Sequence, residues 1–70
     1  MQREPVHSSA VASVGYEPAT NVLEIEFVDG DTYQYFAVPA SVHAAFLAAD
    51  SLGAYFARQI RHTYTSTKVS

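Results

Sequence analysis

The residues from Leu23 to Phe27 (LEIEF) alternate between apolar and acidic side chains, and this alternation constrains the fold more than any other feature of the sequence. A period of two residues is typical of a β-strand with one buried side and one side facing water. Asp29-Gly30 follows as a hairpin turn, and residues 32–38 (TYQYFAV) are rich in types that favour strands. The sequence therefore predicts an antiparallel hairpin at the centre of the fold.

The geometry of the turn determines which side of the hairpin carries Tyr33 and Tyr35. A two-residue type I′ turn at Asp29-Gly30 places Gln34 in the core and both tyrosines beside the glutamates. A three-residue turn over residues 28–30, with the glycine in a left-handed bulge position, places the tyrosines on the apolar side instead. The second register is favoured because it leaves Gln34 in water, and the tyrosines are then mostly core.

Further elements flank the hairpin. Residues 10–16 (AVASVGY) predict a first strand, in which Gly15 marks a bulge or a close-packing point. Residues 39–50 begin with proline and are rich in alanine, which predicts a helix. The Asp50-Ser51 pair provides a cap for a second predicted helix, from residue 52 to about residue 62.

These elements predict an α+β fold with a three-stranded antiparallel sheet followed by two helices, in the order β-β-β-α-α. The β-type residues of the segment 62–70 allow a short final strand. We expect a flexible arm over residues 1–8, one domain over residues 9–66 and a flexible tail over residues 67–70. The predicted core consists of Val14, Leu23, Ile25, Phe27, Tyr33, Tyr35, Val42, Phe46, Leu52, Phe56 and Ile60.

The chain has 70 residues, of which 49% are apolar, and it contains no cysteine. A domain of this size has one core and little margin of stability, so dimerisation or docking on a partner would help to stabilise it. Residues 1–9 lack the apolar run of a signal peptide, and no segment is long enough to span a membrane. We therefore expect a cytoplasmic protein without a membrane partner.

Short motifs spread over residues 6–65 resemble, in their order, the KTSC domain family. That family is named for its occurrence at the C-terminus of some lysyl-tRNA synthetases, and it also includes small stand-alone proteins of bacteria and phages. The resemblance implies no established activity, and it suggests RNA binding through the association with synthetases. The sequence departs from the family at Leu52, where a lysine is frequent. The motifs are Ser8-Ser9, Val14-Gly15-Tyr16, LEIEF, Gly30, Tyr33-Gln34-Tyr35, Val38-Pro39, Ser51 with Gly53, Tyr55-Phe56 and Ile60-Arg61.

Charge is unevenly distributed along the chain, which has a net charge of −3. All seven acidic residues precede residue 51, whereas three of the four basic residues follow it. Arg58, Arg61 and Lys68 of this basic end are candidates for contacts with phosphates, and Tyr64 is a candidate for stacking on a base. The acidic side of the hairpin, with its two glutamates, would repel a nucleic-acid backbone.

The sequence contains no pattern that predicts catalysis or a bound metal. The three histidines lie in different predicted elements, and none belongs to a paired ligand motif. Ser51 is more simply a helix cap than a nucleophile, and Glu24 and Glu26 point together from a solvated strand face where nothing would raise a pKa. We therefore predict neither an enzyme nor a cofactor.

The sequence thus predicts a small binding module without catalytic activity. Its leading predicted ligand is RNA or single-stranded nucleic acid, contacted by Arg58, Arg61, Tyr64 and Lys68. The alternative is an adaptor that binds a protein partner or a second copy of itself. Phe36 is the candidate contact for that role, because the favoured register places this aromatic on the polar outer face.

Overall fold

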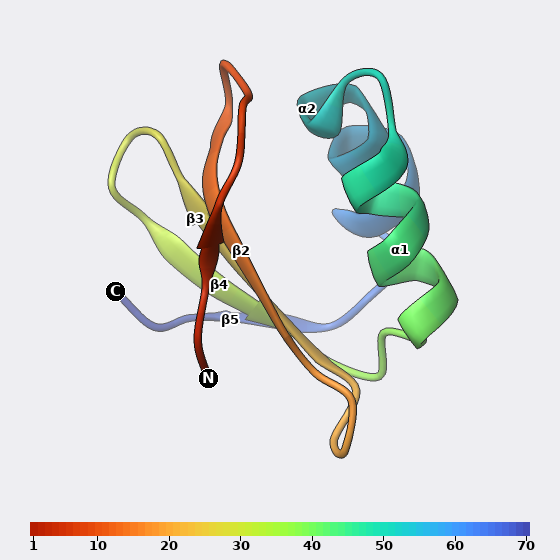
Figure 1. The fold of residues 1–70 in the computed structure, drawn as a ribbon. Helices are drawn as coiled ribbons and strands as arrows, with labels where there is room; N and C mark the ends of the chain where they lie inside the picture. The colour runs from red at the N-terminus through yellow and green to blue at the C-terminus, as the bar shows by residue number, and fades with distance from the viewer.

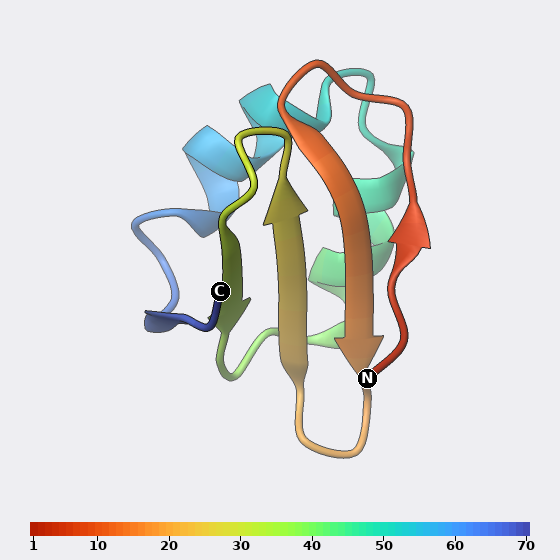
Figure 2. The same ribbon diagram turned by 90° about the vertical axis from the view of Figure 1, so that its left-hand side faces the viewer.

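The computed structural model describes residues 1–70 as a five-stranded antiparallel sheet with helices packed against one face (Figure 1). The strands lie side by side in chain order, and the helices stand behind them in the view of Figure 2. The strands are β1 (Glu4–Pro5), β2 (Val11–Glu17), β3 (Val22–Phe27), β4 (Thr32–Tyr35) and β5 (Ser66–Lys68). The helices are α1 (Ala40–Ala48), α2 (Leu52–Tyr55) and a π-helix, η1 (Phe56–Ile60).

The hairpin of β3 and β4 has the favoured register. Ile25 lies opposite Tyr33, and Leu23 lies opposite Tyr35. The turn closes with a 3.0 Å hydrogen bond from the Gly30 N–H to the Phe27 carbonyl, and Gly30 has a φ of 101°. This left-handed conformation favours glycine, so the predicted three-residue turn with a glycine bulge is confirmed.

The predicted three-stranded sheet is wrong, because each end of the chain adds an edge strand. β5 forms in the segment that allowed a final strand, and it pairs with β4. β1 forms in the segment expected to be an arm, where Glu4 lies opposite Val14. A strand of two residues is too short to show an alternating pattern. Arg3, directly before β1, helps to hold it against the sheet, because its side chain donates hydrogen bonds to Ser13 (3.0 Å) and to Glu24.

Gly15 in β2 lets the N-terminal segment lie close to the sheet. A Cβ atom at this position would lie 2.8 Å from the carbonyl oxygen of Gln2, closer than such atoms approach each other. The prediction of a close-packing point is thus confirmed. The irregularity of β2 falls elsewhere, between Val11 and Ser13.

The core lies between the sheet and the helices. Most of the predicted core residues are buried, but Phe27, Tyr33 and Val42 are only partly buried at its margin. Val11 and Val38 are fully buried, although they were not predicted to be part of the core. The buried apolar residues are Val11, Val14, Leu23, Ile25, Tyr35, Val38, Phe46, Leu52, Phe56 and Ile60.

The second predicted helix consists of two parts. The Ser51 hydroxyl accepts a 3.2 Å hydrogen bond from the Ala54 N–H, which confirms the predicted cap. After one α-helical turn the chain widens into η1, where the Arg61 N–H donates to the Phe56 carbonyl at 2.9 Å. Such single π-turns are rare, and they occur frequently at functional sites. None of the helices is long and apolar enough to cross a bilayer.

Candidate functional site

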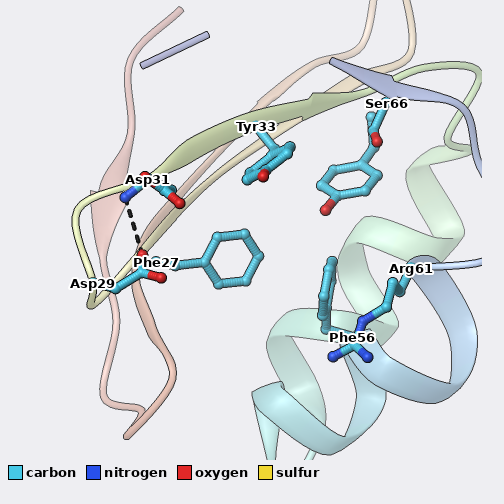
Figure 3. A pocket seen from close by; sticks show the side chains of 8 residues that line it. Phe27, Asp29, Asp31, Tyr33, Phe56, Arg61 and Ser66 are labelled. Carbon is cyan, nitrogen blue, oxygen red and sulfur yellow. Dashed lines mark hydrogen bonds between the residues drawn. The ribbon is translucent and has the colours of Figure 1, made fainter. Parts of the chain in front are cut away.

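A pocket of ≈ 340 Å³ opens between the β3–β4 turn and η1, on the helix side of the sheet (Figure 3). This volume is in the range of sites that bind small ligands or single groups of larger ones. The lining residues come from the hairpin, η1 and β5. They are Phe27, Asp29, Asp31, Tyr33, Tyr35, Phe56, Arg61 and Ser66.

Four aromatic rings form the wall of the pocket, with Phe56 at their centre. The ring of Phe56 meets that of Phe27 at 5.1 Å and 65°, and that of Tyr35 at 5.5 Å and 76°. Tyr33 packs edge-on against Phe27 at 6.1 Å. These edge-to-face contacts stabilise the rings in fixed orientations. Because Phe27 and Tyr33 are only partly buried, their outer edges are accessible to a ligand.

Arg61 forms the cationic end of the pocket. Its guanidinium carbon lies 5.5 Å from the centre of the Phe56 ring, a cation–π contact that the π-turn makes possible. The ion pairs of the protein involve Arg3 and Lys68, but neither Arg61 nor the exposed Arg58. Two arginines without acidic partners therefore lie on and just after η1, three positions apart in the chain.

Asp29 and Asp31 form the acidic end, on the opposite side of the pocket (Figure 3). The Asp29 carboxylate accepts the Asp31 N–H at 3.0 Å, which stabilises the turn. The Asp31 carboxylate lies 3.3 Å from the ammonium of Lys68 on β5. Each carboxylate thus uses one oxygen within the protein and has a second oxygen for other partners.

Tyr33 and Tyr35 line the same space and carry hydroxyl groups. Burial raises the pKa of Tyr35 above its usual value, and the neighbouring Tyr33 adds to this shift while Arg61 opposes it. The Tyr35 hydroxyl therefore keeps its proton well above neutral pH and can donate a hydrogen bond. In Figure 3 the hydroxyl of Tyr33 points into the open space between the hairpin and the helix.

The residues proposed from the sequence lie at different distances from this pocket. Arg61 lines it, and Arg58 is exposed nearby on η1. Lys68 lies at its margin, paired with Asp31, while Tyr64 is half-buried against the core. Phe36 is half-buried just after β4, where its N–H donates to the Thr65 carbonyl at 2.9 Å.

The sequence did not predict the pocket itself. Phe27, Tyr33, Tyr35 and Phe56 were expected only as core, Asp29 only as a turn residue, and Asp31 was given no role. The sequence did contain one signal for a pocket. Tyr33 and Tyr35 were predicted to lie on the apolar face of the hairpin, and the predicted helices offered few large residues to cover this aromatic row. Whether a gap remains above such a row depends on the position of the covering helix.

A second pocket, of ≈ 640 Å³, lies at the other edge of the sheet, between β1, β2 and α1. Tyr16 and His43 stack there with ring centres 4.6 Å apart, beside Leu47, which is 45% exposed. The Tyr16 hydroxyl donates to the Val38 carbonyl at 2.6 Å. Burial lowers the pKa of His43, so its ring is neutral at pH 7.

Glu24 and Glu26 do not form an acid–base pair. Glu24 is only 8% exposed, so the expectation of a fully solvated acidic face is wrong. Burial alone would raise its pKa, but hydrogen bonds from Gln34 and Arg3, together with the charge of Arg3, lower the pKa below its usual value. This carboxyl group is therefore a structural anion. No group of three or more acidic or histidine side chains is arranged to hold a metal ion.

The fold and the pocket define a small α+β domain in which an open antiparallel sheet carries an aromatic recess on its helix-covered face. The sequence pattern of the KTSC domain matches residues 7–64, and the chain belongs to the KTSC domain family. A KTSC domain protein from Yersinia pestis has the same fold, with a TM-score of 0.93 and 41% sequence identity. The match covers 99% of this chain and 97% of that one.

Relatives of the chain include both small and large proteins. An uncharacterized protein of Stutzerimonas stutzeri is 48% identical over 56 residues, which are 80% of this chain and 79% of that protein. The lysine–tRNA ligase of a Nostoc species is 36% identical over 62 residues, which are 89% of this chain but 11% of the ligase. The domain therefore occurs both as a small protein and as a part of a much larger enzyme.

Proposed function

We propose that this protein is a non-catalytic module that binds single-stranded RNA with η1 and the adjacent aromatic pocket. The observation that carries the proposal is the position of Arg61, which lies over Phe56 at the end of the pocket and has no acidic partner. Proteins that bind single strands combine cations for the phosphates with aromatic rings for the bases. Arg58 adds a second exposed cation on the same helix.

The distribution of charge supports the use of this face. Glu24 and Glu26 alternate with the buried Leu23 and Ile25, so they lie on the face of the sheet opposite to the helices. Their carboxylates contact Arg3, which offsets part of their charge. An RNA strand that approaches η1 therefore does not meet Glu24 and Glu26, the residues expected from the sequence to repel a nucleic-acid backbone.

The relatives support RNA as the nucleic acid. The lysine–tRNA ligases of two Nostoc species carry a segment that matches 89% of this chain. Those enzymes act, by their names, on tRNA. A binding domain within such an enzyme would contribute by holding the RNA, and we carry this role over to the present chain as part of the proposal.

Fluorescence anisotropy with a labelled single-stranded RNA octamer, at low and at physiological salt, tests the proposal. The Arg58→Ala/Arg61→Ala variant should bind at least about tenfold more weakly, with a salt slope reduced by roughly 1.4, because each phosphate contact to a single strand releases about 0.7 of a counterion. The Arg58→Lys/Arg61→Lys variant is the matched control, since it keeps both charges and should retain most of the salt dependence. Equal binding by the wild type and the alanine variant would refute the proposal.

The adaptor role stays a prediction with its own test. Phe36 is half-buried and does not belong to the side chains that pack against the core, so part of its ring is available for contact. Sedimentation of the wild type and of Phe36→Ser over a range of concentrations would measure self-association. A monomer at every concentration would exclude the homodimer form of this role.

A further inference from the structure

We infer that the aromatic pocket holds one unstacked base of the bound RNA and selects bases with an exocyclic amino group, cytosine over uracil. This inference rests on the proposed function, because the strand must first be bound along η1. In this inference the arginines bind the phosphates, and the hairpin side of the pocket selects the base.

The carboxylates that would select the base lie at the turn end of a row of side chains that continues along β4. Asp31, Tyr33 and Tyr35 alternate along the chain, so their side chains share the helix-facing side of the sheet. Asp31 occupies the end of this row nearest to the turn, with Asp29 beside it. The two carboxylates therefore face the same end of the pocket, opposite to Arg61 (Figure 3).

Carboxylates discriminate between cytosine and uracil by their hydrogen-bonding chemistry. An ionised aspartate only accepts hydrogen bonds. Cytosine presents an amino group at the position where uracil presents a carbonyl oxygen. The free oxygens of Asp29 and Asp31 can accept from the amino group, but they repel the carbonyl. Lys68 approaches a single oxygen of Asp31 and leaves the other for the base.

The polarity of the pocket matches the polarity of a nucleotide. A nucleotide has a phosphate at one end and a polar base edge at the other, joined by a flat apolar ring system. The pocket presents Arg61 at one end, the carboxylates at the other, and the edges of Phe27 and Tyr33 between them. Its ≈ 340 Å³ is at the lower end of the range for ligand sites, which fits one base rather than a base pair.

The test compares the binding of two labelled RNA octamers, oligo-C and oligo-U, by anisotropy. Their backbone charges are equal, so the arginines contribute equally to both. The wild type should bind oligo-C about tenfold or more tightly than oligo-U, as expected for one well-formed contact to a base. Asp31→Asn should abolish or reverse this preference, because the amide also donates a hydrogen bond and accommodates uracil.

Two further variants make the result specific. Asp29→Asn keeps an oxygen that can accept the Asp31 N–H, so the turn should fold, and it should also reduce the preference for oligo-C. Asp50→Asn is the matched control, since it removes the same charge outside the pocket and should leave the preference unchanged. Circular dichroism confirms that each variant is folded.

The outcomes separate this inference from the proposed function. Salt-sensitive binding with equal affinity for the two octamers overturns base selection but leaves RNA binding intact. A lack of binding to both octamers overturns both. A preference for oligo-C that is lost in both pocket variants, but kept at lower affinity in Arg58→Ala/Arg61→Ala, supports both.

Discussion

The guanidinium carbon of Arg61 lies 5.5 Å from the centre of the Phe56 ring, although Phe56 begins η1 and Arg61 follows its last residue, five positions later. Residues five apart point to different sides of a regular α-helix, which has 3.6 residues per turn. The hydrogen bond from the Arg61 N–H to the Phe56 carbonyl widens this turn and brings both side chains to the same side. The backbone of η1 thus positions a cation over one wall of the pocket.

Arg61→Lys should weaken RNA binding more than Arg58→Lys does, although both variants keep the charge. Only Arg61 lies over a ring, and lysine lacks the planar group that stacks there. We expect a loss of about two- to fivefold for Arg61→Lys, in line with an exposed cation–π contact, and almost none for Arg58→Lys. Anisotropy at one fixed salt concentration measures both. Equal losses would show that the stacked geometry is irrelevant to binding.

Glu24→Gln should destabilise the protein by about 1–2 kcal/mol at neutral pH, because it removes a charged acceptor from Arg3 and Gln34. Folding lowers the pKa of Glu24, so its stabilising contribution is present above the unfolded pKa and is lost as the pH falls through the folded value. Thermal melts below about pH 4.5 should therefore show a smaller gap between the variant and the wild type.

Glu26→Gln is the control for Glu24→Gln, since Glu26 lies 3.9 Å from Arg3 and its side chain is 37% exposed. It should change the melting temperature much less. If the two variants lose equal stability at neutral pH, the burial of the Glu24–Arg3 pair adds nothing to the free energy of unfolding.

Stability should fall on acidification through the histidine range, because folding lowers the pKa of His43 from its ordinary value of 6.5. The unfolded chain then takes up a proton more readily than the folded protein, so the free energy of unfolding decreases as the pH drops below that value. Melting curves between about pH 7 and pH 5 should show this decrease in the wild type and less of it in His43→Gln. The exposed His62 provides the control, and His62→Gln should behave as the wild type does.

Gly15→Ala should displace β1 from the edge of the sheet. The new methyl group would meet the Gln2 carbonyl oxygen at 2.8 Å and the Cγ of Arg3 at 3.0 Å. We expect a loss of about 1–3 kcal/mol from overpacking, together with faster exchange of the Val6 amide, which donates to the Ala12 carbonyl. Hydrogen exchange followed by NMR measures the second effect.

Gly53→Ala is the matched control for this substitution. Its Cβ would meet only the Cβ of Ala10, at 3.2 Å, and alanine favours the helix in which it lies. If the hydrogen-exchange rate of the Val6 amide is the same in Gly15→Ala as in the wild type, Gly15 is not needed for β1 to pack against the sheet.

The central hairpin was predictable because several local signals agree on one register. The alternation in LEIEF identifies the buried side of β3, and Gly30 supplies the positive φ that the three-residue turn requires. Ser51 was predictable as a cap for the same reason, since its hydroxyl meets an N–H three residues later. These features depend on neighbours in the chain.

β1 and the pocket were not predictable because they depend on contacts between distant residues. The position of β1 depends on Arg3 reaching Glu24 across β2, which no local pattern encodes. The aromatic face of β4 was assigned correctly, but the recess beside Tyr33 depends on how the turn and η1, which are distant in sequence, pack together. The π-turn itself has no recognised sequence signal, so the position of Arg61 over Phe56 could not be derived.

Both outer edges of the sheet are formed by the ends of the chain, in β1 and β5, which have two and three residues. Tension applied through the termini would therefore act first on these short strands. They would peel away while β2, β3 and β4 stayed paired beneath the helices. The two ends of the domain would therefore yield under load before its core does.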